Sequence, residues 1–180
     1  MSVNLRGQSK PAKILVLGNT ASGKSFLAAK IAKQLNLPRF SLDEIYWQKN
    51  WTHVSRAEFL AGQREIIARK IWVIDGTFAE FGLRGRFAAA DAAIFLDISP
   101  RQCLRRAISR RGDGRASLPH GADDRHLGFA KSVEFLVEIL LFNLLDRRRI
   151  RKLAREFPGK LIIIKNWSEE EKVLENLAKK

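Results

Sequence analysis

The sequence predicts an α/β fold in which a phosphate-binding loop joins the first strand to the first helix. The first observation is the pattern G-x-x-x-x-G-K-S at residues 18–25, which fills every fixed position of such a loop. The second is its context, because an apolar run at residues 13–17 precedes the loop and a helical pattern over residues 22–35 follows it. The third is length, since 180 residues fit one domain, residues 1–180, that needs no disulfide or structural metal.

The predicted loop presents backbone and side-chain donors to a polyphosphate. Its two glycines let the backbone curl until several N–H groups point at phosphate oxygens, and the helix that follows adds partial positive charge. Lys24 is expected to reach the β- and γ-phosphates, and Ser25 to supply a hydroxyl to Mg²⁺. A glycine-bearing turn that matches by chance would rarely also lie between a strand and a helix. The sequence therefore predicts binding of ATP and Mg²⁺ by Gly18, Asn19, Thr20, Ala21, Ser22, Gly23, Lys24 and Ser25.

The segments after the loop alternate between helix and strand patterns. The first helix is expected to end at residues 36–38, because Pro38 cannot continue it. Ser55 and Glu58 have the spacing of a capping box that begins a helix over residues 55–70. Further strands are predicted from short apolar runs at residues 39–42, 71–74, 92–96 and 161–164, and a terminal helix over residues 168–180.

Three of these predicted strands end in an aspartate: Asp43, Asp75 and Asp97. Ligands of open α/β sheets bind beyond the carboxyl ends of the strands, so these carboxylates are expected near the phosphate loop. Asp75 and Asp97 are rival candidates for a magnesium carboxylate, and spacing alone does not separate them. Asp43 is a candidate for the acceptor side or, alternatively, a helix cap. Trp47 and Trp51, which follow it, either line a substrate site or cover the sheet.

A basic segment at about residues 101–130 predicts a lid over this edge of the sheet. A basic helical pattern is followed there by a glycine-bearing stretch. Planar guanidinium groups match phosphate oxygens, so Arg110, Arg111 or Arg115 are expected to swing onto a transferring phosphoryl group. The alternative is a solvated basic helix face followed by a loop.

The stretch from residue 124 to residue 157 predicts one long helix or two consecutive helices. Residues 133–145 are apolar on nearly all sides, so this part either packs against the sheet and the lid helix or forms a subunit interface. Both a monomer and a homodimer are therefore compatible with the sequence. The arginines and lysine between residues 147 and 155 either meet phosphates or form a surface charge run.

Composition limits the setting and the partners. The 33 lysines and arginines exceed the 19 acidic residues and give a formal charge of +14, which attracts polyanions such as nucleotides and nucleic acid. The single cysteine, Cys103, has no partner in the chain and no leader pattern is visible, so a reducing cytoplasm is expected. The longest apolar run is too short and too interrupted to span a membrane, and the three scattered histidines do not predict a zinc site.

Taken together, these motifs resemble those of the adenylate-kinase-like P-loop proteins called DNA topology modulation proteins, over most of the chain. The resemblance implies a three-layer P-loop NTPase fold with a five-stranded parallel sheet, helices on both faces and a helical lid. It also favours Asp75 over Asp97 for the metal. This chain has Thr77 and Phe78 where Asn and Tyr are commoner, so hydrogen bonding at these positions is left open. The resemblance rests on the phosphate loop, Asp43 with Trp47 and Trp51, residues 72–76, Arg86 ahead of Ala90 and Asp91, residues 94–97 and the arginines near Arg147.

The expected function is ATP-dependent phosphoryl transfer to a nucleotide or a small hydroxylated metabolite. Lys24 would bridge the β- and γ-phosphates, and Ser25 with Asp75 would hold the metal. Asp43 would orient or deprotonate the acceptor hydroxyl, and Arg86 would bind an anionic group of the acceptor. Arg110 and Arg111 from the lid would stabilise the transferring charge. The alternatives are a nucleic-acid-binding regulator with a nucleotide switch and a weak ATPase without an acceptor.

Overall fold

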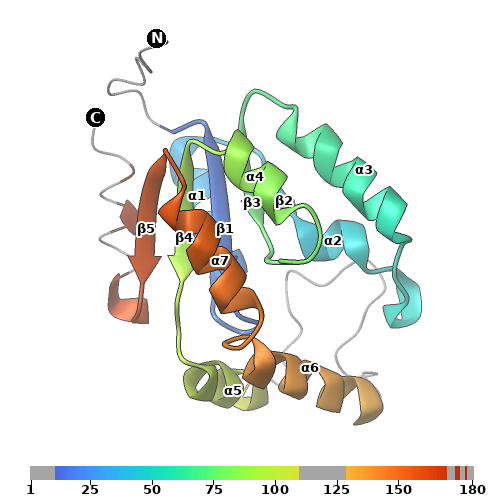
Figure 1. The fold of residues 1–180 in the computed structure, drawn as a ribbon. Helices are drawn as coiled ribbons and strands as arrows, with labels where there is room; N and C mark the ends of the chain where they lie inside the picture. The colour runs from blue at the N-terminus through green and yellow to red at the C-terminus, as the bar shows by residue number, and fades with distance from the viewer. Residues whose placement is uncertain (1–10, 110–128, 170–172, 175–176, 178–180) are drawn as a thin grey trace.

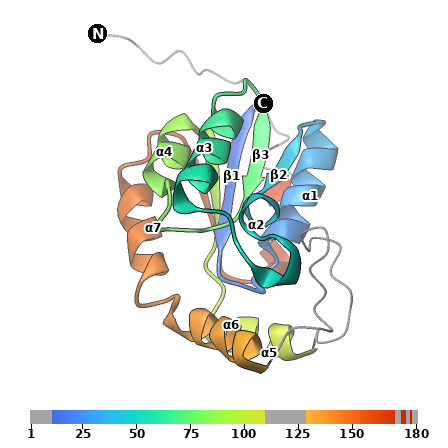
Figure 2. The same cartoon turned by 90° about the vertical axis from the view of Figure 1, so that its right-hand side faces the viewer.

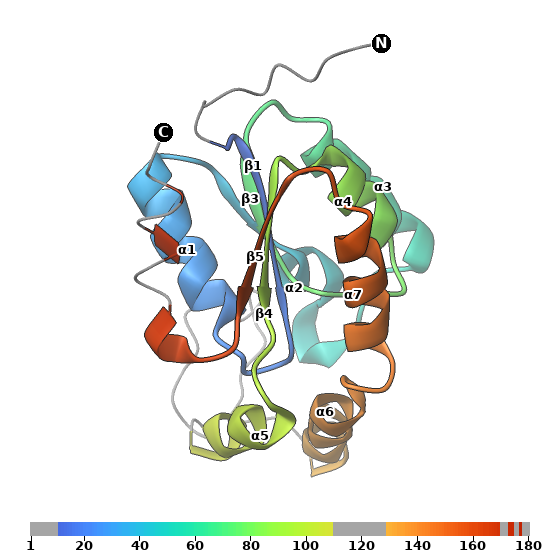
Figure 3. The same ribbon diagram turned by 60° about the vertical axis from the view of Figure 1, so that its left-hand side comes forward.

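The protein forms a five-stranded parallel sheet with helices on both faces (Figure 1). The computed structural model describes residues 11–109, 129–169, 173, 174 and 177. The strand order is β2-β3-β1-β4-β5. Figure 3 shows α1 on one side of the sheet and α3, α4 and α7 on the other. The predicted α/β class and the five-stranded parallel sheet are therefore confirmed.

The strands form where the sequence has short apolar runs. Parallel strands that are covered on both faces have nearly continuous apolar sequences, and β1, β3 and β4 are buried throughout apart from Lys13. The register pairs Gly18 at the end of β1 with Leu96 at the end of β4, which places the two carboxyl ends side by side. The strands are β1 (Lys13–Gly18), β2 (Arg39–Ser41), β3 (Trp72–Asp75), β4 (Ala92–Leu96) and β5 (Lys160–Ile164).

The helices follow the sequence patterns with several changes of boundary. The helix expected from residue 22 begins at Lys24, because Gly23 adopts a left-handed φ of 99° at its N-cap. Ser55 and Glu58 form the predicted capping box. The helices are α1 (Lys24–Leu35), α2 (Leu42–Tyr46), η1 (Lys49–Trp51), α3 (Arg56–Ile67), α4 (Leu83–Ala89), α5 (Pro100–Ser109), α6 (Phe129–Leu141), α7 (Asp146–Arg155) and η3 (Trp167–Glu169).

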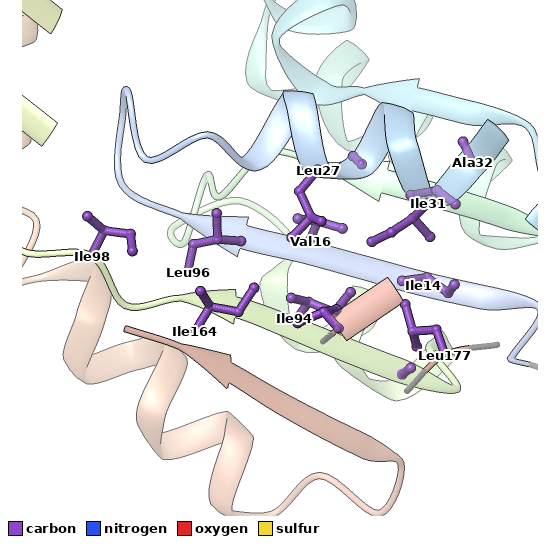
Figure 4. Packing of buried hydrophobic residues seen from close by; sticks show 14 of the residues in the cluster. Ile14, Val16, Leu27, Ile31, Ala32, Ile94, Leu96, Ile98, Ile164 and Leu177 are labelled. Atoms are coloured by element: carbon purple, nitrogen blue, oxygen red, sulfur yellow. The ribbon is translucent and has the colours of Figure 1, made fainter. Parts of the chain in front are cut away.

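Two apolar clusters hold the layers together, one on each face of the sheet. Neighbouring residues of a strand point to opposite faces, so Ile14 and Val16 belong to one cluster and Leu15 and Leu17 to the other. Figure 4 shows Val16 and Ile14 directed toward Leu27 and the other apolar side chains of α1. Each cluster spans several elements, so burial of apolar surface ties the sheet to both helical layers.

The long C-terminal helical stretch is divided into α6 and α7 by the turn at residues 142–145. Helix α6 packs inward through Ile139, and Phe142 of the turn is also buried. The opposite side of this stretch stays exposed. The stretch therefore packs inward on one face only, and its other apolar face is uncovered in this structure. The exposed apolar side chains are Val133, Val137, Leu140, Leu141, Leu144 and Leu145.

Helices α5 and α6 pack against each other beyond the carboxyl ends of the strands (Figure 2). The predicted lid, residues 101–130, therefore begins as α5 and ends at the start of α6. Its middle part, residues 110–128, lies outside the described residues, as does most of the predicted terminal helix. In the described part of the chain, no helix has both the length and the apolar character needed to cross a bilayer.

Candidate active site

The loop between β1 and α1 curls tightly at the carboxyl edge of the sheet. A Cβ added to Gly18 would lie 2.6 Å from the Ser22 Oγ, so the first glycine is required by close packing. Ala21 also has a positive φ, 60°, and the Ser22 amide donates to the Asn19 carbonyl over 3.1 Å. The N-cap residue of α1 is Gly23, which has no side chain to bind the first amides of the helix. The first amides of that helix are therefore available to an anion.

A hydroxyl of the loop contacts the carboxylate at the end of β3. The Ser25 Oγ donates to Asp75 Oδ1 over 2.8 Å, and Asp75 is completely buried. Arg39 Nε donates to the other carboxylate oxygen, Asp75 Oδ2, over 2.7 Å. Sequence reasoning had paired Ser25 with Asp75 but missed Arg39. The available signal was the position of Arg39 in β2, the short strand that pairs with β3.

Asp97, the rival carboxylate, is engaged by α7 instead. Arg147 donates to both of its oxygens, with Nε at 2.6 Å and Nη2 at 2.9 Å, and Arg151 Nη2 donates over 2.8 Å. Burial acts to raise the pKa of Asp97, but the hydrogen bonds and charges of the two arginines outweigh it and hold that pKa below its usual range. The sequence allowed Arg147 and Arg151 to bind phosphates. In the structure they bind Asp97, at the end of a strand of the same protein.

Arg86 lies among backbone carbonyls of its own protein. Its side chain is completely buried, and it donates to the carbonyls of Gly76, Thr77, Phe78 and Phe81 over 2.6–3.1 Å. Desolvation lowers its pKa to about 9. Its guanidinium is enclosed by backbone carbonyls, and its contact with an anionic group of the acceptor stays a prediction. Because it binds four carbonyls of the segment after β3, Arg86 holds that segment in place.

That segment in turn holds the phosphate loop. The Thr77 hydroxyl donates to the Gly18 carbonyl over 2.6 Å and accepts from the Gly18 amide over 3.1 Å. The hydrogen-bonding role left open for this position is thus present with threonine. Arg86 therefore supports the loop indirectly, because it binds the carbonyl of Thr77 and the Thr77 hydroxyl binds Gly18.

Helix α6 meets the loop from the other side, which the sequence did not indicate. Asn19 Nδ2 donates to the Ile139 carbonyl over 2.9 Å, and this contact is buried. The Thr20 hydroxyl lies 3.5 Å from a carboxylate oxygen of Glu138. Desolvation raises the pKa of Glu138, Lys24 acts to lower it, and the charges of Asp43 and Asp146 act to raise it. Glu138 thus lies within electrostatic reach of both Lys24 and Asp43.

Asp43 lies in the first turn of α2 and is half-buried. It is not the helix cap that the sequence allowed, because Ser41 holds the N-cap position. Trp47 ends the same helix, and its ring packs against Trp51 at 5.7 Å between centroids. Phe135 of α6 packs against both indoles, at 6.2 and 5.5 Å. The two tryptophans therefore join α2 and η1 to α6 instead of covering the sheet.

A second pair of side chains closes on the start of α1. Trp167, just after β5, donates through its indole Nε1 to the Ser22 carbonyl over 2.7 Å. The Arg106 guanidinium lies over the Trp167 ring at 4.7 Å from its centroid. A Cβ on Gly23 would come within 2.9 Å of Arg106 Nη1, the end of a long side chain that can move, so it is the φ of 99° that favours glycine there. Arg110, Arg111 and Arg115, the predicted lid arginines, lie outside the described residues.

Two of the solved structures that resemble this chain in fold are shikimate kinases. A shikimate kinase from Bacteroides thetaiotaomicron is similar with a TM-score of 0.55 and 18% identity, over 93% of this chain and 96% of that one. A shikimate kinase from Acinetobacter baumannii in complex with shikimate has a TM-score of 0.61 and 14% identity, over 93% of this chain and 90% of that one. The chain has the fold of the P-loop kinases. At these identities the likeness extends to the P-loop kinase fold and not to a substrate. No protein-family model and no curated protein matches the sequence.

Proposed function

We propose that the protein is an ATP-dependent phosphotransferase that acts on a small hydroxylated metabolite or a nucleotide. The observation that carries this proposal is the curled loop at the carboxyl edge of the sheet, with Ser25 2.8 Å from the buried Asp75. The P-loop kinase fold of two structures with kinase names supports it. The loop amides and Lys24 would bind the β- and γ-phosphates.

The donor set of the site fits magnesium. Ser25 and Asp75 offer a hydroxyl and a carboxylate, which are the hard oxygen ligands that Mg²⁺ takes alongside nucleotide phosphates. When bound, the metal would neutralise phosphate charge. Ser25 and Asp75 would hold it, while Arg39 keeps the Asp75 carboxylate in place.

Asp43 is the proposed acceptor-side carboxylate. It lies in the first turn of α2, beyond the end of β2, and its charge reaches Glu138 beside the loop. It would orient or deprotonate the acceptor hydroxyl. Arg110 and Arg111 stay proposed as lid arginines that would stabilise the transferring charge.

The resemblance to DNA topology modulation proteins supports a second candidate, a nucleic-acid-binding regulator. Its physical support is the charge of +14 and the exposed basic side chains Arg148, Lys152 and Arg155 of α7. Binding through general basicity falls steeply with salt. Titration with duplex DNA at about 50 and 200 mM salt separates the candidates, since affinity kept at the higher salt favours the regulator. The cytoplasm is the proposed compartment, supported by the single, buried Cys103.

The phosphotransferase is tested by ADP formation with a panel of nucleosides, nucleotides and hydroxylated metabolites. At least one acceptor should raise the rate well above that with water, whereas a weak ATPase would show one rate with every compound. Lys24→Ala should lower the stimulated rate by about 10²-fold or more, because a preorganised charge at the phosphates is lost. Lys33→Ala, an exposed lysine of the same helix, is the matched control. Unchanged activity of Lys24→Ala with a native circular dichroism spectrum would refute the assignment.

A further inference from the structure

Asp75, the carboxylate proposed to hold the metal, already has a cation of the protein beside it. Its side chain is completely buried, and Arg39 Nε lies 2.7 Å from Oδ2, while the Ser25 hydroxyl donates to Oδ1. The strand register explains the pairing. Arg39 of β2 pairs with Val73 of β3, two residues before Asp75, so the three side chains point to the same face of the sheet. The negative charge of Asp75 is therefore balanced inside the protein before any ligand binds.

The two strand-end aspartates are paired in different ways. Arg147 binds both oxygens of Asp97 through Nε and Nη2, and Arg151 adds a third donor. Arg39 binds Asp75 through Nε alone, and its Nη2 is buried without a hydrogen-bond partner among the described residues. The second bond of Asp75 comes from a hydroxyl, which is itself a ligand that Mg²⁺ accepts. Asp75 is thus neutralised by one arginine but is held by fewer donors than Asp97.

The surroundings of Asp75 offer little negative charge to a free divalent cation. Within the part of the chain that the structure describes, no group of three or more His, Cys, Asp or Glu side chains could hold a metal ion. Lys24 belongs to the same loop as Ser25, and the whole chain has a formal charge of +14, so both the loop and the molecule repel a cation. Nucleotide phosphates would supply the negative charge and the oxygen ligands that the site lacks.

We infer that Arg39 is a positioning residue that makes magnesium binding at Asp75 depend on the nucleotide. This inference rests on the proposed phosphotransferase function and concerns the metal side of the same site. Without nucleotide, the guanidinium balances the charge of Asp75, so a free divalent cation binds poorly. With nucleotide, the phosphates add the missing charge, and Arg39 keeps Oδ2 in place while Oδ1 and the Ser25 hydroxyl serve the metal. The protein thereby takes up the metal and the nucleotide together.

The test measures how the melting temperature of the free protein responds to magnesium, which needs no turnover. MgCl₂ is titrated at about pH 8, where an ordinary carboxyl group is ionised, and NaCl keeps the ionic strength constant. For the wild type, Mg²⁺ alone should leave the melting temperature unchanged, whereas Mg²⁺ with ADP should raise it. Arg39→Gln should respond to Mg²⁺ alone, at a concentration at least about tenfold below any effect on the wild type, because the charge of Asp75 is no longer offset.

Three further variants show whether the gained response comes from the proposed pair. Arg39→Lys keeps the positive charge and should respond to Mg²⁺ alone less than Arg39→Gln does. Arg39→Gln combined with Asp75→Asn should lose the gained response, because the carboxylate is gone. Arg151→Gln is the matched control, since it removes an arginine from the other strand-end aspartate with the same change in net charge, and it should gain no response.

The outcomes separate this inference from the function beneath it. If Mg²⁺ alone raises the melting temperature of the wild type and Asp75→Asn removes the rise, the inference is wrong, whether or not an Arg39 variant folds. If Arg39→Gln responds no more than the wild type, or Arg151→Gln gains the same response, Arg39 does not set the dependence. In these cases the phosphotransferase stands as long as Mg²⁺ with ADP stabilises the wild type. If Mg²⁺ with ADP has no effect, the proposed function loses its metal site and this inference fails with it.

Discussion

Arg86 shows how far burial changes the role of a charged residue. Four carbonyls replace the water that its guanidinium loses, and desolvation still lowers its pKa to about 9. These carbonyls belong to the segment that contains Thr77, whose hydroxyl binds both polar backbone groups of Gly18. The residue therefore supports the phosphate loop through the segment that contains Thr77.

Replacement of Arg86 should affect stability before affinity. We expect Arg86→Met to lower the free energy of unfolding by about 3 kcal/mol, because several buried carbonyls lose their donors together. Urea denaturation measures this change. Arg86→Lys keeps the charge but not the several donors, and should fall between Met and wild type. A variant with wild-type stability and a raised KM for an anionic acceptor would contradict this structural role and support the acceptor contact expected from sequence.

The two strand-end aspartates should separate by their response to magnesium. With ADP bound, Asp75→Asn should abolish the rise in melting temperature that Mg²⁺ causes, whereas Asp97→Asn should keep it, because Asp75 contacts Ser25 of the loop. Asp97→Asn should instead cost about 1–2 kcal/mol of stability through its ion pairs with Arg147 and Arg151.

The pH dependence supplies a second readout for Asp97. Because its folded pKa is lowered, its contribution is present above the unfolded pKa near 4 and is lost as the pH falls through the folded value. The stability difference between wild type and Asp97→Asn should therefore vanish in acid. The opposite pattern in magnesium, with the rise kept by Asp75→Asn and lost by Asp97→Asn, would exchange the two assignments.

At the scale of elements, the phosphate loop is linked to α6 by a hydrogen bond from Asn19 to Ile139. Ile139 lies in the last turn of α6, where carbonyls lack partners within the helix, and Asn19 Nδ2 supplies one. Asn19→Ala should speed hydrogen exchange of the amides near residue 139 about fivefold, as expected for the loss of about 1 kcal/mol of local stability. Gln34→Ala, on the exposed side of α1, is the control. Equal exchange in wild type and Asn19→Ala would show that the contact does not hold the helix.

Elements were predictable from sequence where the signal is local. Apolar runs of strand length gave β1, β3 and β4, and the capping box at Ser55 gave the start of α3. The division between α6 and α7 was not resolved, because residues 142–145 contain neither glycine nor proline. The contact of Asn19 with Ile139 spans 120 residues of sequence, so no local pattern could place α6 beside the loop.

The same distinction holds for the candidate site. The loop and Asp75 were predictable because their spacing and strand context follow from phosphate chemistry. Glu138, Arg39 and Trp167 were missed because their roles arise only when distant segments pack together. The carbonyl partners of Arg86 were missed as well, since a sequence does not show which backbone carbonyls an arginine will contact.

For the whole molecule, charge and fold favour the same ligand. A formal charge of +14 raises the local concentration of polyanions and speeds their encounter with the protein. The parallel sheet then presents the loop, Asp75 and Asp43 at one edge, where a nucleotide and an acceptor can meet. The positive charge of the protein and the position of the loop therefore both favour binding of a triphosphate.

Calorimetric titration of a nonhydrolysable ATP analogue with Mg²⁺ tests the central claim most directly. We expect one site per chain with a dissociation constant between about 1 μM and 1 mM, a range typical of enzyme substrates, and its loss in Lys24→Ala. The absence of heat with every purine triphosphate, from protein whose circular dichroism shows the native fold, would contradict the claim that the loop after β1 binds a polyphosphate.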